Sequence, residues 1–423
     1  MCAAELDPGR TTRFVYSEVV SSLHERDALR GLLGDFAAAL DRLGGTPARS
    51  AAENPALPLV VLVATGGTER LVLETLAPRP ADPVLLLAHP GHNSLAAALE
   101  VLALVQREGR VGQIVYLEGP HDEPALARLG AVVHEIGSLL ALRRCRIGLV
   151  GRPSDWLVAS SPTAELVRAR WGATLIELPI ERLRSAVEQA SAADDSALVR
   201  NWLQGAERVI EPSPEAVTLA SRVHRVLREL AREERLDALT VRCFELVSML
   251  GTTGCCALAE LNDQGVVAGC EGDVPSVLAM QWVKLLCGSA AWMANPTRVD
   301  HARRLLLLAH CTVPRSLVRS YRLRSHFESG SGVGIQGVLP PGPVTLLRIG
   351  GASLERLWLA EGMLERNTDH TDLCRTQVEV HLEGAALEAL LCAPLGNHLV
   401  LVPGHYAVRL ARCHGWLAPT SAV

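Results

Sequence analysis

The chain has 423 residues, of which 48% are hydrophobic and 21% are charged, and its formal net charge is -5. This composition predicts a folded globular protein of two or three domains, and the near balance of charge argues against nucleic-acid binding by phosphate neutralisation. No apolar run of the roughly 18 to 20 residues that span a bilayer is evident, and no secretory signal is recognised. The 11 cysteines follow no disulfide framework, which is typical of reduced thiols. We therefore expect a cytoplasmic protein without nucleic-acid or membrane partners.

Apolar runs of strand length alternate with helical patterns along the first part of the chain. Such runs lie at 57–64, 83–88 and 113–117, and each ends in a turn that leads into a helical pattern. Repetition of strand, turn and helix is typical of a parallel sheet with helices on both faces. We therefore predict the α/β fold class, with a doubly wound parallel-sheet domain at residues 1–144.

The same alternation restarts at residue 145 and ends near residue 300. Its strand-like runs lie at 146–150, 173–178 and 238–243. Residues 145–300 are therefore predicted as a second doubly wound α/β domain. Beyond it, short apolar runs are separated by turn residues, and 376–384 alternates with period two as a half-buried strand does. We predict a C-terminal, mainly antiparallel β-domain at 301–423, with its boundary to the second domain between 265 and 300.

The acidic residues Glu245 and Asp273 lie in a largely apolar stretch at 241–276 that is rich in Cys and Gly. Each follows a predicted strand, and ligands of open α/β sheets gather beyond the carboxyl ends of the strands. A buried carboxylate must be paired, hydrogen-bonded or metal-bound. Spacing alone leaves Asp273 equally open to a second role, as the N-cap of a helix at 274–287. Glu271, two residues before Asp273, is expected to face the opposite side.

Three histidines and two arginines complete the candidate site residues. His310 ends a strand-like run, His326 lies in the segment RLRSHFESG, and His398 precedes an apolar run. Taken alone, each histidine is more often a hydrogen-bonded residue than a ligand. Carboxylates with a neutral imidazole are nevertheless what a manganese-type site needs. Arg322 and Arg324 are candidates for binding an anionic substituent of a substrate, or belong to a solvated strand edge.

The ordered motifs RCFEL, GCCALAELNDQGVVAGCEGD, LLLAHCTVP, HFESGSGVGIQG and GNHLVLVPGHY resemble the L-fucose isomerase family and, more distantly, L-arabinose isomerase. The resemblance covers residues 145–423, and the compact loops indicate a short-chain branch. It implies two α/β domains followed by a β-domain. It also implies Mn²⁺, with Mg²⁺ or Co²⁺ as alternatives, bound by Glu245, Asp273 and His398. The two acids are then the proton-transfer pair, and a homo-oligomer (trimer or hexamer) is the expected assembly.

From this resemblance we expect a ketol isomerase that interconverts an aldose and a ketose of the fucose or arabinose type, or a derivative. The reaction moves a proton between neighbouring carbons next to a carbonyl, so it needs acid–base groups and charge stabilisation. His310, His326 and Arg324 are then candidate substrate-binding residues. Two alternatives stay open: a non-catalytic sugar-binding or regulatory protein of the same fold, and a metal-dependent sugar epimerase or aldolase.

Overall fold

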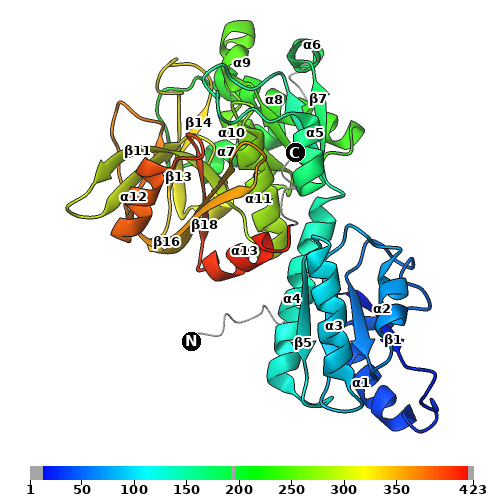
Figure 1. Ribbon diagram of the computed structural model, residues 1–423. Helices are drawn as coiled ribbons and strands as arrows, with labels where there is room; N and C mark the ends of the chain where they lie inside the picture. Colours follow the sequence, from blue (N-terminus) through cyan, green and yellow to red (C-terminus); the bar gives the residue numbers. More distant parts are fainter. Residues whose placement is uncertain (1–12, 192–195, 418–423) are drawn as a thin grey trace. The chain divides into compact units, whose positions relative to one another are not determined.

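The structure of the protein is a computed structural model, which describes residues 13–191 and 196–417 (Figure 1). The described chain divides into two compact units. One unit consists of the described parts of Met1–Ala141 and Arg412–Val423, and the other is Leu142–Ala411.

A five-stranded parallel sheet forms the centre of the first unit. Its strands are β1 (Phe14–Val19), β2 (Gly45–Pro47), β3 (Leu59–Val63), β4 (Val84–Ala88) and β5 (Gly112–Tyr116), in the order β2-β1-β3-β4-β5. Every pairing is parallel, and β3 and β4 are buried along their whole length, as central strands of a parallel sheet are. The helices of this unit are α1 (Arg30–Arg42), α2 (Glu69–Leu76), α3 (Ser94–Arg107) and α4 (Glu123–Leu142). The prediction of a parallel-sheet α/β domain is confirmed.

Helix α4 is apolar but contains one buried acid. Among the described residues it is the one helix long and apolar enough to cross a membrane, which the sequence reading did not anticipate, and 61% of its apolar window is buried. Glu135 is fully buried in this helix, where its carboxylate accepts hydrogen bonds from Arg412 Nε at 2.6 Å and from the indole N–H of Trp416 at 3.1 Å. Because a buried carboxylate requires such donors, residues 412–417 complete the first unit. These residues fall within the range 301–423 that the sequence predicts as the β-domain.

The second unit contains a four-stranded parallel sheet. Its strands are β6 (Arg146–Val150), β7 (Thr174–Leu178), β9 (Ala238–Val241) and β10 (Val267–Cys270), in the order β10-β9-β6-β7. All three pairings are parallel, as predicted. Its helices are α5 (Ala164–Trp171), α6 (Ile180–Gln189), α7 (Ser196–Gly205), α8 (Pro214–Glu233), α9 (Cys243–Leu250), α10 (Cys255–Asp263) and α11 (Val274–Cys287).

A closed antiparallel barrel follows in the same unit. Its strands are, in barrel order, β11 (Trp292–Asp300), β12 (Leu305–His310), β17 (Thr376–Leu382), β16 (Arg356–Asn367), β15 (Gly342–Gly350) and β18 (Leu399–Pro403). A small sheet of β14 (Gly334–Val338), β13 (Ser320–Arg324) and β8 (Arg208–Val209), the short helices η2 (Arg315–Leu317) and α12 (Gly384–Cys392), and helix α13 (Ala407–His414) complete the described elements. The predicted antiparallel C-terminal sheet is confirmed, and its closure into a barrel removes exposed edges.

The barrel and the second α/β layer share one hydrophobic core. Trp292, Leu306 and Leu346 from barrel strands belong to the same cluster of buried side chains as Trp202 of α7 and Ala220 of α8. A continuous core cannot be divided without exposing apolar surface. Residues 142–411 therefore form one compact unit, which differs from the predicted division near residue 300.

Candidate active site

A cavity of about 450 Å³ lies within the second unit. Its walls come from α9, the ends of β10 and β12, strand β11, and the loops after β13 and before β17 and β18. Glu271, His310 and His326 line it together with Trp156 and Phe244, whose rings meet edge to face at 5.0 Å. None of the described residues that line it is Arg or Lys. Buried acids, imidazoles and aromatic faces are suited to holding and deprotonating a small polar molecule.

His398 is fully buried beside this cavity, between two carboxylates. Its Nδ1 lies 2.8 Å from Oδ2 of Asp273, and its Nε2 lies 3.6 Å from Oε1 of Glu271. The second distance exceeds a hydrogen bond, and Nε2 is a buried nitrogen without a hydrogen-bond partner. The contact with Asp273 therefore orients the ring and leaves Nε2 directed towards Glu271.

Asp273 is a helix cap and the partner of His398 at the same time. Its Oδ1 accepts the N–H of Ser276 at 2.8 Å and so caps α11. Nη1 of Arg348 in β15 donates to both of its oxygens, at 2.9 and 3.2 Å. Both roles that spacing left open for Asp273, cap and polar partner, are thus filled. Because its oxygens are engaged by these donors, Asp273 holds His398 in position from outside the cavity lining.

Glu271 faces the same imidazole as Asp273, which corrects the expectation that it faces the opposite side. Glu271 has φ +63° and Gly272 has φ +73°, so the chain leaves the extended conformation directly after β10. A Cβ at Gly272 would lie 2.7 Å from Cα of Pro153, which explains the glycine. The indole N–H of Trp156 donates to Oε2 of Glu271 at 2.6 Å. This turn places two carboxylates, two residues apart, on either side of His398.

The buried charges of Asp273, Glu271 and His398 stabilise one another. Burial disfavours ionisation of Asp273, yet Arg348 and His398 outweigh burial and hold the pKa of its carboxyl well below the usual range. Burial also opposes the charge on His398, but Asp273 and Glu271 raise the pKa of its imidazole to about 9. For His310, burial dominates and lowers the pKa to about 3, so this ring is neutral near pH 7. The carboxyl pKa of Glu271 is lowered, because His398 more than offsets the effect of burial.

One carboxylate and two imidazoles form a group that fits a divalent metal ion. The ligand atoms of Glu271, His310 and His398 lie within 4.8 Å of one another. Thr312 Oγ1 is 2.9 Å from Nδ1 of His310, and Asp273 holds Nδ1 of His398, so Nε2 of each ring is left for an ion. At His398 the ion would take the place of the imidazolium proton. Such mixed carboxylate and imidazole sets suit divalent transition metals. The buried, unpartnered Nε2 of His398 gives this fit a structural basis.

Of the three predicted metal ligands, the structure brings two into contact. Asp273 and His398 touch, whereas Glu245 is ion-paired through Oε1 with Nε of Arg242 at 2.7 Å. Neighbouring Phe244 lines the cavity, but Glu245 does not, since the first turn of α9 directs its side chain to Arg242. Among the described residues, the metal-like group contains Glu271 instead. The predicted set and the observed group therefore share His398 alone, because Glu271 and His310 stand in place of Glu245 and Asp273.

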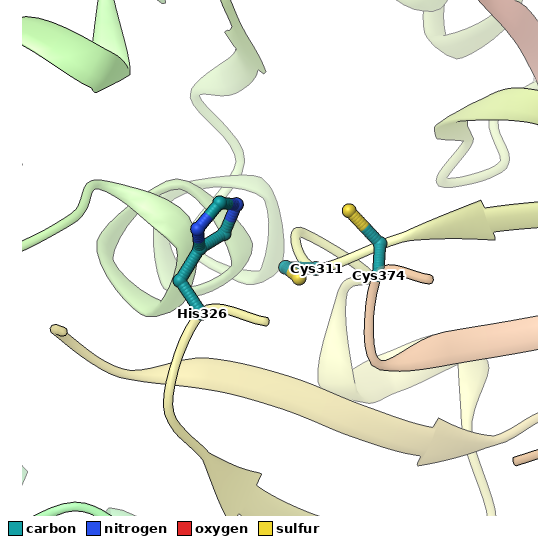
Figure 2. Close-up of side chains that lie close together, drawn as sticks. All are labelled: Cys311, His326 and Cys374. Atoms are coloured by element: carbon teal, nitrogen blue, oxygen red, sulfur yellow. The ribbon is translucent and has the colours of Figure 1, made fainter. Parts of the chain in front are cut away.

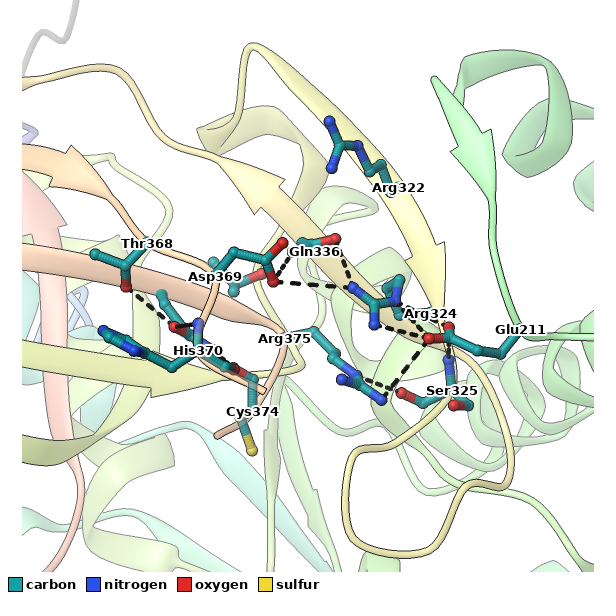
Figure 3. A network of polar contacts seen from close by, with 12 residues as sticks. Glu211, Arg322, Arg324, Ser325, Gln336, Thr368, Asp369, His370, Cys374 and Arg375 are labelled. Carbon is teal, nitrogen blue, oxygen red and sulfur yellow. Dashed lines mark hydrogen bonds and ion pairs between the residues drawn. The ribbon is translucent and has the colours of Figure 1, made fainter. Parts of the chain in front are cut away.

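The predicted substrate-contact residues divide in the same way. His310 and His326 line the cavity. Arg324 instead binds Glu211, with Nε 2.8 Å from Oε1, and reaches Gln336 at 3.1 Å (Figure 3). Arg322 lies apart from that network and forms an exposed ion pair with Glu207 at 3.5 Å, although β13 is the central strand of its small sheet. The charge of Arg324 is thus committed to holding the loop that follows β13.

Sequence reasoning missed two residues that hold the carboxylates on either side of His398. Arg348 is 1% exposed, and its Nη2 donates to Ser160 Oγ at 2.6 Å in addition to its contacts with Asp273. A lone arginine inside the apolar strand run PVTLLRIG is the signal that could have revealed a buried anion. Trp156 has no comparable signal, because a tryptophan in a turn is equally suited to an exposed position.

Comparisons with known proteins agree with this chemistry. No family model matches the chain. It is similar to curated proteins named sulfoquinovose isomerase: 24% identical over 205 residues to those of Priestia aryabhattai and Priestia megaterium, covering 46% of this chain and 44% of each relative. It is 25% identical over 247 residues to that of a Clostridium species, covering 54% of this chain and 52% of the relative. The chain spans about half the length of the curated relatives it matches. By name, these distant relatives are isomerases of a sugar.

Proposed function

We propose that the protein is a sugar isomerase that interconverts an aldose and its ketose. The observation that carries this proposal is the convergence of Glu271, His310 and His398 beside a cavity of about 450 Å³. Its support from outside the structure is the similarity to proteins named sulfoquinovose isomerase. The proposed substrate is a sugar of the fucose or arabinose type or a derivative. Sulfoquinovose, the sugar in the name of these relatives, is one such candidate.

Glu271 is the residue best placed to move the proton. It lines the cavity, and its lowered pKa keeps the carboxylate ionised and able to accept a proton near pH 7. Trp156 holds Oε2, which fixes the carboxylate and leaves Oε1 on the His398 side. We assign to Glu271 removal of the proton from the carbon next to the carbonyl and its return to the neighbouring carbon. Asp273, which the sequence paired with Glu245 for this step, becomes a positioning residue.

A divalent ion, with Mn²⁺ as the first candidate, belongs to the same proposal. Glu271, His310 and His398 would hold it. When bound, the ion supplies positive charge close to the substrate oxygens on which negative charge develops. Asp273 and Arg348 keep Nε2 of His398 directed towards that position. His326 lines the same cavity and would contact the substrate there, directly or through an ion bound at its ring. Cytoplasmic location and assembly as a homo-oligomer are further parts of the proposal.

The test is a product analysis of the purified full chain with added Mn²⁺. Neutral aldoses such as L-fucose and L-arabinose are compared with sulfoquinovose, and the ketose is measured in each case. In D₂O, proton transfer through Glu271 should leave deuterium on the carbon next to the carbonyl. A sugar-binding protein would bind a member of the panel in calorimetry without ketose or deuterium. An epimerase would give another aldose, and an aldolase two fragments; either product would replace the isomerase proposal.

A further inference from the structure

A second group of metal-ligating side chains lies on the wall of the same cavity. It consists of Cys311, His326 and Cys374, whose ligand atoms lie within 4.8 Å of one another (Figure 2). No member is shared with the group of Glu271, His310 and His398. Cys311 is 1% exposed and His326 7%, while Cys374 is partly exposed. The cluster is therefore sheltered but reachable from the cavity.

The three ligands come from separate segments that are tied to one another. Nε of Arg375, next to Cys374, donates to the carbonyl of Ser325, next to His326, at 2.8 Å (Figure 3). The backbone N–H of Arg375 also points at Sγ of Cys311, at 3.4 Å. One residue thus links the segments of all three ligands. This N–H also gives the sulfur a fixed hydrogen-bond donor, which orients Cys311.

The ring of His326 is held in place from two sides. Ser329 Oγ lies 3.3 Å from its Nδ1, and the ring of Phe244 meets it edge to face at 5.4 Å. The loop itself is closed by hydrogen bonds from His326 N–H to the Ser331 carbonyl at 3.0 Å and from Gly330 N–H to the His326 carbonyl at 2.9 Å. With Nδ1 engaged, Nε2 is the nitrogen that remains for an ion. The outer contacts therefore orient the ligand, as they do in metal sites generally.

We propose that Cys311, His326 and Cys374 bind one Zn²⁺ ion whose fourth coordination position opens into the cavity. Two thiolates and one imidazole are soft to borderline ligands and select zinc over the oxygen-seeking ions that Glu271 attracts. Each thiol loses its proton to solvent as its sulfur–zinc bond forms, so binding releases two protons from the cysteines. Three protein ligands with an open position are the pattern of reactive zinc sites, whereas structural sites are closed by four. The site stands whether or not the protein isomerises sugars.

Metal binding at this site is tested with Co²⁺, which can occupy zinc sites. Co²⁺ bound by cysteine shows a thiolate-to-metal charge-transfer absorption band. The metal-free full chain, kept reduced, is titrated with Co²⁺ and then with Zn²⁺. We expect the band to saturate at one ion per chain and to disappear as Zn²⁺ displaces Co²⁺. Cys374→Ser should remove most of the band. Cys392→Ser, which changes an exposed cysteine of α12, is the matched control and should keep it.

Three further variants decide whether this cluster is the site. Glu271→Gln alters the other group and should leave the thiolate band intact. His326→Gln should weaken the thiolate band. This variant tests the site independently if circular dichroism shows that Cys374→Ser does not fold. Cys243 and Cys270 line the same cavity with sulfurs 2.7 Å apart. A band lost in Cys243→Ser but kept in Cys374→Ser would assign the metal to that pair. That result, or no band in the unaltered protein, overturns the proposal.

Discussion

Arg348 and Asp273 form an ion pair in which the side chains are 1% and 0% exposed and Nη1 lies 2.9 Å from Oδ2. The pair connects β15 of the barrel to the N-terminus of α11, and through Asp273 it reaches His398. A buried pair of this kind adds little to stability compared with apolar packing, but removing one partner leaves an uncompensated charge. Its role is therefore to fix the geometry around one imidazole.

Arg348→Met should destabilise the protein by about 3 to 5 kcal/mol, because Asp273 is then a buried carboxylate without its cation. Denaturant unfolding of the second unit measures this free energy. Arg366→Met serves as the control, since Arg366 pairs with Glu379 on the exposed side of the barrel and should change stability far less. Equal losses in the two variants would contradict the role given to burial.

Glu271→Gln and Glu245→Gln distinguish the observed site from the one that the motifs predicted. Removing the general base at Glu271 should lower ketose formation by about 10²-fold or more. Glu245→Gln should cost much less activity, because its carboxylate only pairs with Arg242. Both turnover rates are measured on folded protein with the substrate found in the panel. The opposite order of the two effects would return the proton transfer to Glu245.

Removal of Mn²⁺ by EDTA should abolish ketose formation, and added Mn²⁺ should restore it. His398→Gln removes a ligand and should prevent stoichiometric Mn²⁺ binding in equilibrium dialysis. Asp273→Asn only loosens the orientation of that ligand, so its affinity for Mn²⁺ should fall by about 10- to 100-fold. Full activity in rigorously metal-free protein would exclude the ion from the reaction.

Stability should decline in acid partly through Glu260. Burial raises the pKa of this carboxyl, but the indole N–H of Trp202, at 2.8 Å, and Arg315 more than reverse this and hold the pKa below its usual range. The folded pKa therefore lies below the unfolded value of about 4.3, so the stabilisation is complete above that pH and is lost as pH falls. Glu260→Gln should be less stable than the parent at pH 7. Urea unfolding should show that the difference in free energy of unfolding between the two proteins becomes smaller in acid. A difference in free energy of unfolding that does not change with pH would assign the effect to packing.

Arg412→Met should destabilise the first unit by about 1 to 3 kcal/mol, since buried Glu135 keeps only the indole N–H of Trp416. Hydrogen exchange of the α4 amides should speed up accordingly. Val408→Ala changes a residue of the same helix that is 77% exposed and is the control. Unchanged exchange in Arg412→Met would show that the first unit does not depend on this contact.

The layers of the fold could be predicted from local pattern, but the partners of the site could not. Continuous apolar runs such as β3 report burial on both faces, so the parallel sheets followed directly. His398 and Asp273 were found through motif resemblance, and the structure places them in contact. Strand alternation is no guide to Glu271, because its positive φ takes the chain out of the extended conformation at this residue. Arg348 lies 75 residues from Asp273, and no local signal specifies a pair so distant in sequence.

The contact between Glu135 and residues 412–417 also bears on the order of folding. A chain emerging from the ribosome presents its domains from the N-terminus onwards. The sheet of the first unit is synthesised first, yet the donors for its buried acid follow the whole of Leu142–Ala411. The first unit therefore reaches its final form last, after the barrel strands have been made, and a growing chain carries Glu135 without Arg412 until then.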